Sequence, residues 1–193
     1  MPRKSTSTPE HTAADTSVTE ALDRVATQFS KEHGDLAAYT CTMTLPKQFS
    51  EDASEANDLF KKIQSDFCKS VLRGTGITPR YVAIRSADNE KRPEYRCALF
   101  TPADAPLQNP EDYADHGRAI ANTKCCKLGW SCGKLDVVEM LMDAPTVKIH
   151  APIRFSGSNR YAALNTLENY LGPKADAIQG QRSLFVSKTE KAS

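Results

Sequence analysis

The segment covering residues 79–100, PRYVAIRSADNEKRPEYRCALF, constrains the fold of this chain more than any other. Two runs of apolar and aromatic residues flank a polar stretch, which predicts two β-strands joined by a turn. Side chains alternate between the two faces of a strand. The triplet Glu94-Tyr95-Arg96 therefore places a carboxylate and a guanidinium together on one face of the predicted hairpin, with Tyr95 directed into the core.

The other expected elements follow from capping residues and from hydrophobic periodicity. Ser17-Val-Thr-Glu20 is a capping box that starts a helix, and this helix ends before Gly34. Residues 37–45 alternate Thr with strong β-formers, which predicts a strand with one solvent-facing side. The remaining predictions are helices over 53–73, 110–127 and 158–171, strands over 80–86, 94–100, 135–142 and 146–155, and a last ordered segment over 182–187.

Helices and strands do not alternate regularly along the chain, and a hairpin is present. This order favours an α+β fold in which an antiparallel sheet carries helices on its faces. Residues 1–15 are polar and rich in Ser, Thr, Pro and Ala, which is typical of a disordered tail. We expect one domain over 16–188, followed by a short flexible tail over 189–193.

Charge and composition narrow the class of protein. The 193 residues include 25 Lys and Arg against 24 Asp and Glu, a net charge of +1, so any binding to nucleic acid must come from a local basic patch. The sequence has no apolar run of eighteen residues and no secretory signal, which predicts a cytoplasmic protein without a membrane span. Six cysteines in such a compartment are expected to be reduced thiols.

Arginines near the hairpin are candidates for phosphate binding. Arg85 and Arg96 lie on the predicted strands and Arg92 lies between them. Guanidinium groups bind phosphate through two parallel hydrogen bonds, so this cluster would suit a nucleic-acid backbone. The alternative is that these arginines and Glu94 are solvent-facing residues of a half-buried strand. Glu94 alone would be a poor metal site, because a hard cation takes several oxygen ligands.

Tyr170 and Lys174 form a second candidate at the end of the predicted helix over 158–171. A tyrosine hydroxyl attacks a phosphodiester when a cation lowers its pKa and a metal polarises the phosphate. The alternative is that Tyr170 packs beside Leu171 and that Lys174 is a surface charge. Tyr161, next to Arg160, is another tyrosine with the same two interpretations.

Cysteines and histidines are the candidates for a metal site. Cys125, Cys126 and Cys132, with His116 and His150, are the residue types that bind zinc. Adjacent cysteines on a helix project in different directions and the sequence has no CxxC spacing, so buried free thiols are the favoured interpretation. The sequence also has no P-loop, GxGxxG or GxSxG motif.

The hairpin resembles the signature of the gene-two-like replication proteins of inoviruses, the filamentous phages, which also occur in prophages. Members have a strand ending in an acidic residue, a short turn, and a strand that starts with a His-hydrophobic-His triplet. Tyr170-Leu171 with Lys174 resembles their YLxK motif, and residues 181–187, QRSLFVS, resemble their terminal motif. The resemblance covers roughly residues 40–188 in the same order.

The resemblance implies a fold and a chemistry. It implies an antiparallel sheet of about five strands with helices packed on it. The family that the chain resembles is related to endonucleases that nick single-stranded DNA to begin rolling-circle replication. In these enzymes the two histidines hold a divalent metal and the tyrosine becomes joined to the 5′ phosphate. Here Glu94 and Arg96 replace the histidines and Ser86 replaces the acidic residue. An arginine repels a cation, so the resemblance implies a scaffold whose nicking chemistry is degenerate.

Three hypotheses result. The first is a phage or prophage replication-initiator-like protein that binds single-stranded DNA without a cofactor, with Arg85, Arg92, Arg96 and Arg182 on the open sheet face. The second is a non-catalytic effector of a mobile element that binds a host or phage protein, in replication control or inhibition of host defence. The third is an active nickase in which Glu94, with Asp88 or Glu90, binds Mg²⁺ or Mn²⁺.

Overall fold

The computed structural model describes residues 17–86, 92–107, 109–132, 143–172 and 184–187. Six strands form one antiparallel sheet with the order β4-β1-β3-β2-β6, and β5 also pairs with β1. The fold is therefore α+β, as predicted. The helices are α1 (Val18–His33), α2 (Ala53–Thr75), α3 (Pro110–Cys132) and α5 (Arg160–Leu171), with a 3₁₀ turn η1 (Lys47–Phe49), and the strands are β1 (Leu36–Thr44), β2 (Arg80–Arg85), β3 (Glu94–Pro102), β4 (Thr146–Ile149), β5 (Ile153–Phe155) and β6 (Leu184–Val186).

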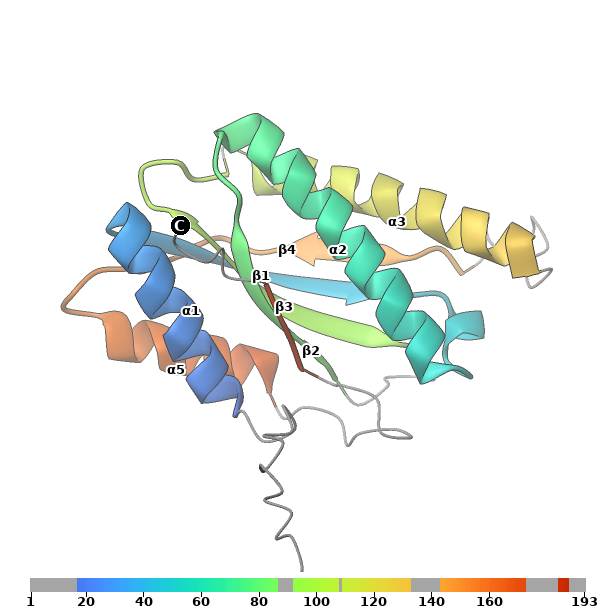
Figure 1. Cartoon of the computed structure of the whole chain (residues 1–193), viewed down its shortest axis with the longest axis horizontal. Helices are drawn as coiled ribbons and strands as arrows, with labels where there is room; N and C mark the ends of the chain where they lie inside the picture. The colour runs from blue at the N-terminus through green and yellow to red at the C-terminus, as the bar shows by residue number, and fades with distance from the viewer. Residues whose placement is uncertain (1–16, 87–91, 108, 133–142, 173–183, 188–193) are drawn as a thin grey trace, which may run out of the picture.

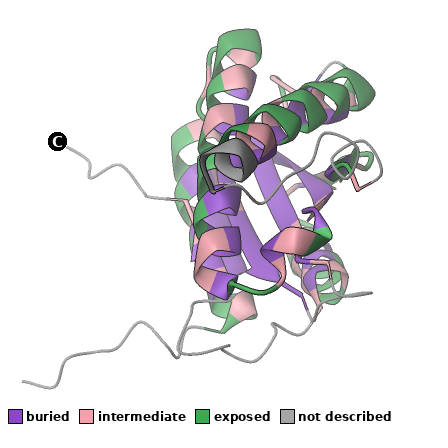
Figure 2. Ribbon diagram, turned by 90° about the vertical axis from the view of Figure 1, so that its right-hand side faces the viewer, coloured by how far each residue is buried: buried purple, intermediate pink, exposed green. Residues whose placement is uncertain are grey.

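Helices cover both faces of the sheet (Figure 1). Helices α2 and α3 pack on one face, and α1 and α5 pack on the other. The sheet is consequently buried on both sides over most of its length, and the buried residues in Figure 2 lie on the strands and on the inward sides of the helices. The expectation of an open sheet face is wrong for most of the sheet, because α1 and α5 bury the face that was predicted to be exposed.

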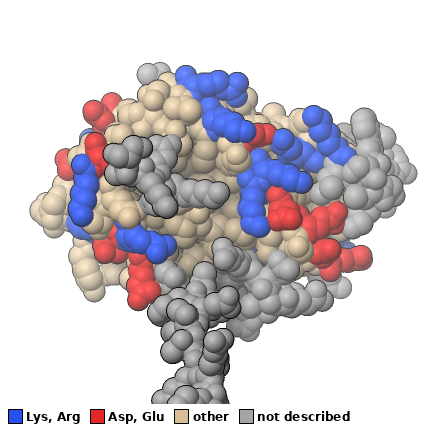
Figure 3. Space-filling view, viewed as in Figure 1, with Lys and Arg blue, Asp and Glu red and all other residues tan. Residues whose placement is uncertain are grey.

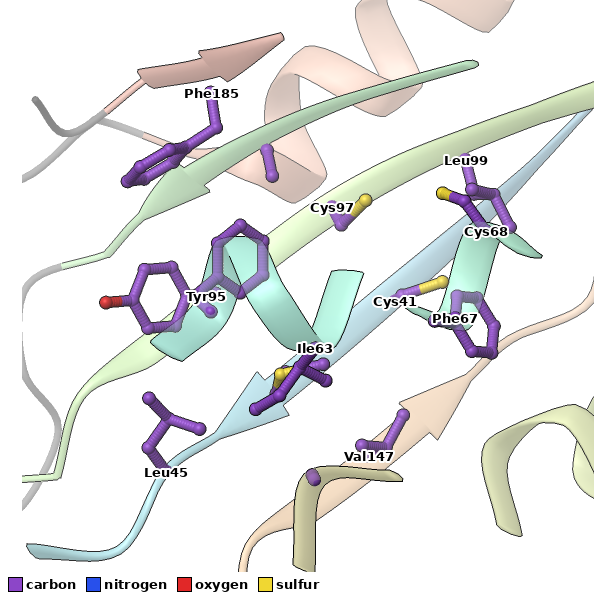
Figure 4. Close-up of a cluster of buried hydrophobic side chains, with 14 of the residues drawn as sticks. Cys41, Leu45, Ile63, Phe67, Cys68, Tyr95, Cys97, Leu99, Val147 and Phe185 are labelled. Atoms are coloured by element: carbon purple, nitrogen blue, oxygen red, sulfur yellow. The ribbon is translucent and has the colours of Figure 1, made fainter. Parts of the chain in front are cut away.

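The larger core lies between the sheet and α2 with α3. Tyr95, in the middle of the predicted triplet, points into this core, where its ring stacks on Phe60 at a centroid distance of 4.1 Å. The Tyr95 hydroxyl donates a hydrogen bond to Asn57 Oδ1 over 2.8 Å, so its polar end is satisfied although it is buried. Figure 4 shows that Cys41 and Cys97 lie on neighbouring strands beneath α2.

The second core is formed by α1 and α5 against the opposite face. It includes Leu36 and Ala38 of β1, which alternate with Ala37 and Tyr39 of the first core. The prediction of a solvent-facing side for residues 37–45 is correspondingly wrong at Thr40, which is buried. Thr42 and Thr44, further along β1, are only half-buried.

Local signals set the ends of the first two long helices. The capping box at Ser17 is formed, since Ser17 Oγ accepts from the Glu20 N–H and Glu20 Oε2 accepts from the Ser17 N–H, both over 3.1 Å. Asp52 Oδ1 caps α2 by accepting from two backbone N–H groups of its first turn. Helix α2 ends at Gly76, whose φ of 74° is a left-handed conformation that glycine adopts without strain.

The predicted strand over 146–155 is two strands with a β-bulge between them. The Thr40 carbonyl accepts from the His150 N–H at 2.9 Å, whereas Ala38 is opposite Ile153. Tyr39 therefore faces two residues, Ala151 and Pro152, and proline has no N–H for the ladder. The predicted strand over 135–142 lies outside the described residues. The segment predicted over 182–187 is described from 184 and forms the edge strand β6, which pairs with β2.

Candidate functional site

The predicted hairpin is present, and its two outer side chains share a face as expected. Arg96 Nε donates to Glu94 Oε1 over 2.9 Å, and the Ser86 hydroxyl donates to the same oxygen over 3.1 Å. The Arg96 side chain is 37% exposed and the Glu94 side chain 14% exposed. The two side chains thus form a half-buried ion pair on the central strand of the sheet.

Strand pairing extends this pair into a polar row. Residues directly opposite each other in neighbouring strands point to the same face. Glu94 is opposite Thr44, which is opposite Thr146, and Arg96 is opposite Thr42, which is opposite Lys148. We call these residues, with Ser86, the polar strip: Thr42, Thr44, Ser86, Glu94, Arg96, Thr146 and Lys148.

Tyr170 comes from the last turn of α5 to the polar strip. Its hydroxyl lies 2.6 Å from Thr42 Oγ1, and its main-chain carbonyl accepts from Arg96 Nη1 over 3.4 Å. The chain folds this way locally because α5 ends at Gly172, which has a φ of 69°. A Cβ on Gly172 would lie 3.3 Å from Arg96 Nη1, so the small residue lets the guanidinium approach the end of the helix.

The guanidinium of Arg96 has a structural role as well as a candidate functional one. The carboxyl end of a helix carries a partial negative charge, and a cation there contributes roughly 0.3–1 kcal/mol. Arg96 lies at this end of α5 and is also paired with Glu94. The structure therefore brings Tyr170 together with Glu94 and Arg96, and it ties helix α5 to the centre of the sheet.

The chemistry open to Tyr170 is limited by its surroundings. Burial raises the pKa of Tyr170 to about 12, and the hydrogen bond with Thr42 and the nearby charge of Arg96 only partly oppose this. The phenol is consequently neutral at neutral pH. A neutral phenol is a weak nucleophile, so this arrangement suits binding better than attack on a phosphodiester.

Two further residues, Lys148 and His150, belong to this site, although the sequence alone did not predict it. Lys148 and His150 are exposed on the face of β4 and its extension that carries Thr42. The ring of His150 lies edge-on to Tyr170, with centroids 6.2 Å apart. The alternation of Thr146, Lys148 and His150 is the sequence signal that these residues share a face. The pairing of β4 with β1 then places Lys148 opposite Thr42, and His150 lies beside Tyr170.

Arg85 does not belong to the site. It is opposite Tyr95 in the sheet and is only 2% exposed, whereas Arg96 is opposite Ile84. The prediction that Arg85 and Arg96 share a phosphate-binding face is wrong, because the two residues are out of phase by one position and point to opposite faces.

Arg92 is held within the fold. Its Nε donates to the Leu45 carbonyl over 3.1 Å, its Nη2 donates to the Ala144 carbonyl over 2.9 Å, and its Nη1 lies 3.2 Å from Asp143 Oδ1. Arg92 therefore joins the end of the hairpin turn to the segments beside β1 and β4. It contributes to this junction and lies outside the polar strip.

The other predicted site residues divide into two groups. Lys174, Arg182, Asp88 and Glu90 lie outside the described residues. Tyr161 is 79% exposed at the start of α5, nine residues before Tyr170, which is about 14 Å along a helix. Its neighbour Arg160 is bound to Asp23 and Thr27 of α1.

Metal-ligating side chains do not converge in the part of the chain that the structure describes, where no group of three or more His, Cys, Asp and Glu residues is found. Cys125 is buried in the first core, and burial raises the pKa of its thiol to about 12. His116 is exposed on α3 and His150 lies at the polar strip. Free thiols are found at Cys41, Cys68, Cys97, Cys125 and Cys126, as the sequence favoured.

The chain matches no family model, no curated protein and no solved structure. Among the described helices, none has the length and apolar character needed to cross a membrane. The case for a function accordingly comes from the arrangement of the polar strip and Tyr170.

Proposed function

We propose that this chain is a replication-initiator-like protein of a phage or prophage that binds single-stranded DNA at the polar strip without nicking it. The observation that carries this proposal is the position of Tyr170, whose hydroxyl lies 2.6 Å from Thr42 while its carbonyl accepts from Arg96. The helix-borne tyrosine and the strand-borne triplet are about 75 residues apart in sequence. Their meeting on the central strand is what the resemblance to replication proteins implies.

The groups at the strip suit a single strand of nucleic acid. Lys148 and Arg96 supply positive charge for phosphates, and Thr42, Thr44 and Thr146 supply hydroxyl donors. The rings of Tyr170 and His150 give flat surfaces on which bases stack, a contribution of about 1–3 kcal/mol per base in other proteins. Because Glu94 neutralises much of the Arg96 charge, we expect weak binding that depends on Lys148.

The absence of nicking in this proposal follows from residue chemistry. Arg96 stands where the resemblance implies a metal ligand, and a guanidinium repels a cation. Glu94 is already bound to Arg96 and Ser86. Burial raises the pKa of Tyr170 to about 12, and its hydroxyl is bonded to that of Thr42, which is not a base at neutral pH.

The experiment is fluorescence anisotropy of a labelled oligothymidylate over a salt series. Under the proposal, the logarithm of the affinity falls with the logarithm of salt concentration by about 0.7 for each phosphate contact on a single strand. Lys148→Gln should weaken binding and flatten this slope. Lys61→Gln is the matched control, since Lys61 is an exposed lysine on α2, on the other side of the sheet.

A second assay separates binding from nicking. The labelled oligonucleotide is incubated with the protein and Mn²⁺, and covalent adducts are resolved on a denaturing gel. We expect no adduct with the wild-type chain. An adduct that disappears in Tyr170→Phe would overturn the non-nicking part of the proposal and establish the nickase hypothesis.

A second candidate function is binding of a host or phage protein at the same surface, as an effector in replication control or in inhibition of host defence. The charge balance favours it, because a net charge of +1 from 25 basic and 24 acidic residues gives little long-range attraction for DNA. DNA binding would be rejected if the affinity did not depend on salt and if the wild type and Lys148→Gln both bound the oligonucleotide only at millimolar concentration. Protein binding would then be the favoured function.

A further inference from the structure

A groove lies between α2 and α3, on the helices that pack on the opposite face of the sheet from α5. It has a volume of about 480 Å³ and is lined by Asp66, Lys69, Leu72, Arg73, His116 and Ile120. The two helices run antiparallel here. Lys124 of α3 bonds to Asp66 of α2, and Tyr113 near the start of α3 lies against Gly74 near the end of α2.

The groove has an apolar floor. Leu72 is 37% exposed and is one of two large hydrophobic side chains that are exposed in the described parts of the chain. Ile120 is only partly buried and lies across the groove on α3. An exposed leucine beside a half-covered isoleucine offers apolar area that a partner's side chain would bury, at roughly 25 cal/mol for each Å² removed from water.

The charges around this floor are mostly positive. Asp66 Oδ1 lies 3.0 Å from Lys69 Nζ, and Asp66 Oδ2 lies 2.7 Å from Lys124 Nζ. The bond with Lys124, and after it the bond with Lys69, lowers the pKa of Asp66. The carboxylate therefore stays ionised and is shared between the two lysines. Arg73 is a second cation of the groove lining, after Lys69. Lys124, which bonds to Asp66 but lies outside the lining, is a third cation, so three cations accompany one carboxylate here.

Lys and Arg side chains gather visibly over α2 and the neighbouring part of α3 in Figure 3. We propose that this groove binds a short acidic segment of a partner protein, with one apolar side chain seated between Leu72 and Ile120 and carboxylates facing Arg73 and Lys69. The charge of the groove and that of such a segment are complementary, and its apolar floor matches an apolar anchor.

The groove favours a peptide over a nucleic acid for two reasons. A nucleic acid carries a phosphate at every step of its strand and cannot avoid the Asp66 carboxylate, whereas a peptide can place an uncharged residue there. Leu72 and Ile120 give a phosphate or sugar nothing to bond, whereas they suit a leucine or aromatic anchor. The proposal does not depend on DNA binding at the polar strip, because the two surfaces lie on opposite sides of the sheet.

The test begins with a random peptide library displayed on phage and panned on the full-length chain, with counter-selection on Arg73→Glu. We expect the enriched peptides to carry Asp or Glu around a leucine or aromatic residue. A synthetic fluorescent copy of one such peptide should bind the wild-type chain at least about tenfold more tightly than Arg73→Glu or Leu72→Ser. Lys61→Glu, on an exposed position of α2 outside the groove lining, should bind it as the wild type does.

Three results would overturn the proposal. Peptides that are not acidic, or that bind Arg73→Glu as tightly as the wild type, would show that the groove does not select negative charge. Oligothymidylate binding lost in Arg73→Glu but kept in Lys148→Gln would assign the groove to nucleic acid. A dimer in analytical ultracentrifugation that Leu72→Ser dissociates would assign it to a second copy of the chain. Circular dichroism and thermal melting of each variant establish that it is folded.

Discussion

The hydroxyl of Tyr170 on α5 lies 2.6 Å from Oγ1 of Thr42 on β1, so the last turn of a surface helix is fastened to a strand near the centre of the sheet. This contact joins two residues that are 128 positions apart in the sequence. It decides where the tyrosine stands relative to Glu94 and Arg96, and therefore what the polar strip can bind.

The first prediction concerns the energy of this contact. Tyr170→Phe and Thr42→Val each remove one partner, and each should lower the free energy of unfolding by about 0.5–1.5 kcal/mol, the net value of a typical hydrogen bond. The double variant should lose little more than either single variant. Urea unfolding of the four proteins measures this, and strictly additive losses would contradict a direct bond.

The second prediction concerns the stability of the fold in alkaline solution. Burial raises the pKa of the Cys41 and Cys68 thiols to about 12, whereas the pKa of a thiol in an unfolded chain is about 8.5. Between these values the unfolded state binds fewer protons than the folded state, so stability is complete below pH about 8.5 and falls as pH rises towards 12. Each such thiol contributes a slope of about 1.4 kcal/mol per pH unit at most.

Urea unfolding across this alkaline range measures the slope. Cys68→Ala should make it shallower, because one group whose pKa differs between the two states is gone, although the cavity itself lowers stability at every pH. A variant with the wild-type slope would mean that the Cys68 thiol ionises in the folded protein as it does when unfolded.

The elements with strong local signals could be predicted from the sequence. The capping box at Ser17 and the hairpin are set by residues close to one another in the chain, and both are present. The direction of Tyr95 into the core follows from alternation alone once the strand is recognised. The α+β class follows from the order of the elements.

Long-range pairing could not be predicted in this way. Whether Arg85 shares a face with Arg96 depends on the register between β2 and β3, and that register pairs Arg96 with Ile84. The position of Lys148 opposite Thr42 depends on β4 pairing with β1, a contact between segments that are remote in sequence. The coverage of the second face depends on where α1 and α5 dock, which local pattern does not determine.

The third prediction concerns Arg92, which the sequence suggested as a phosphate contact. Its guanidinium holds the carbonyls of Leu45 and Ala144 and pairs with Asp143. Arg92→Gln should therefore lower the free energy of unfolding by about 1–3 kcal/mol, since charged hydrogen bonds are lost. Oligothymidylate affinity at a temperature where the variant is folded should not change, and a selective loss of affinity without loss of stability would return Arg92 to the DNA-binding surface.

The fourth prediction uses the close approach of α2 and α3. A Cβ added at Gly74 would collide with the hydroxyl oxygen of Tyr113, while the ring carbon that bears this hydroxyl would be at an ordinary contact distance of 3.4 Å. Alanine is the better helix former by about 1 kcal/mol. Gly74→Ala should consequently raise the free energy of unfolding by about 0.5–1 kcal/mol in a Tyr113→Phe background, and by less, or not at all, when Tyr113 keeps its hydroxyl. Thermal and urea unfolding of the four proteins tests this, and equal gains in both backgrounds would mean that α2 and α3 are further apart at this point than the structure places them.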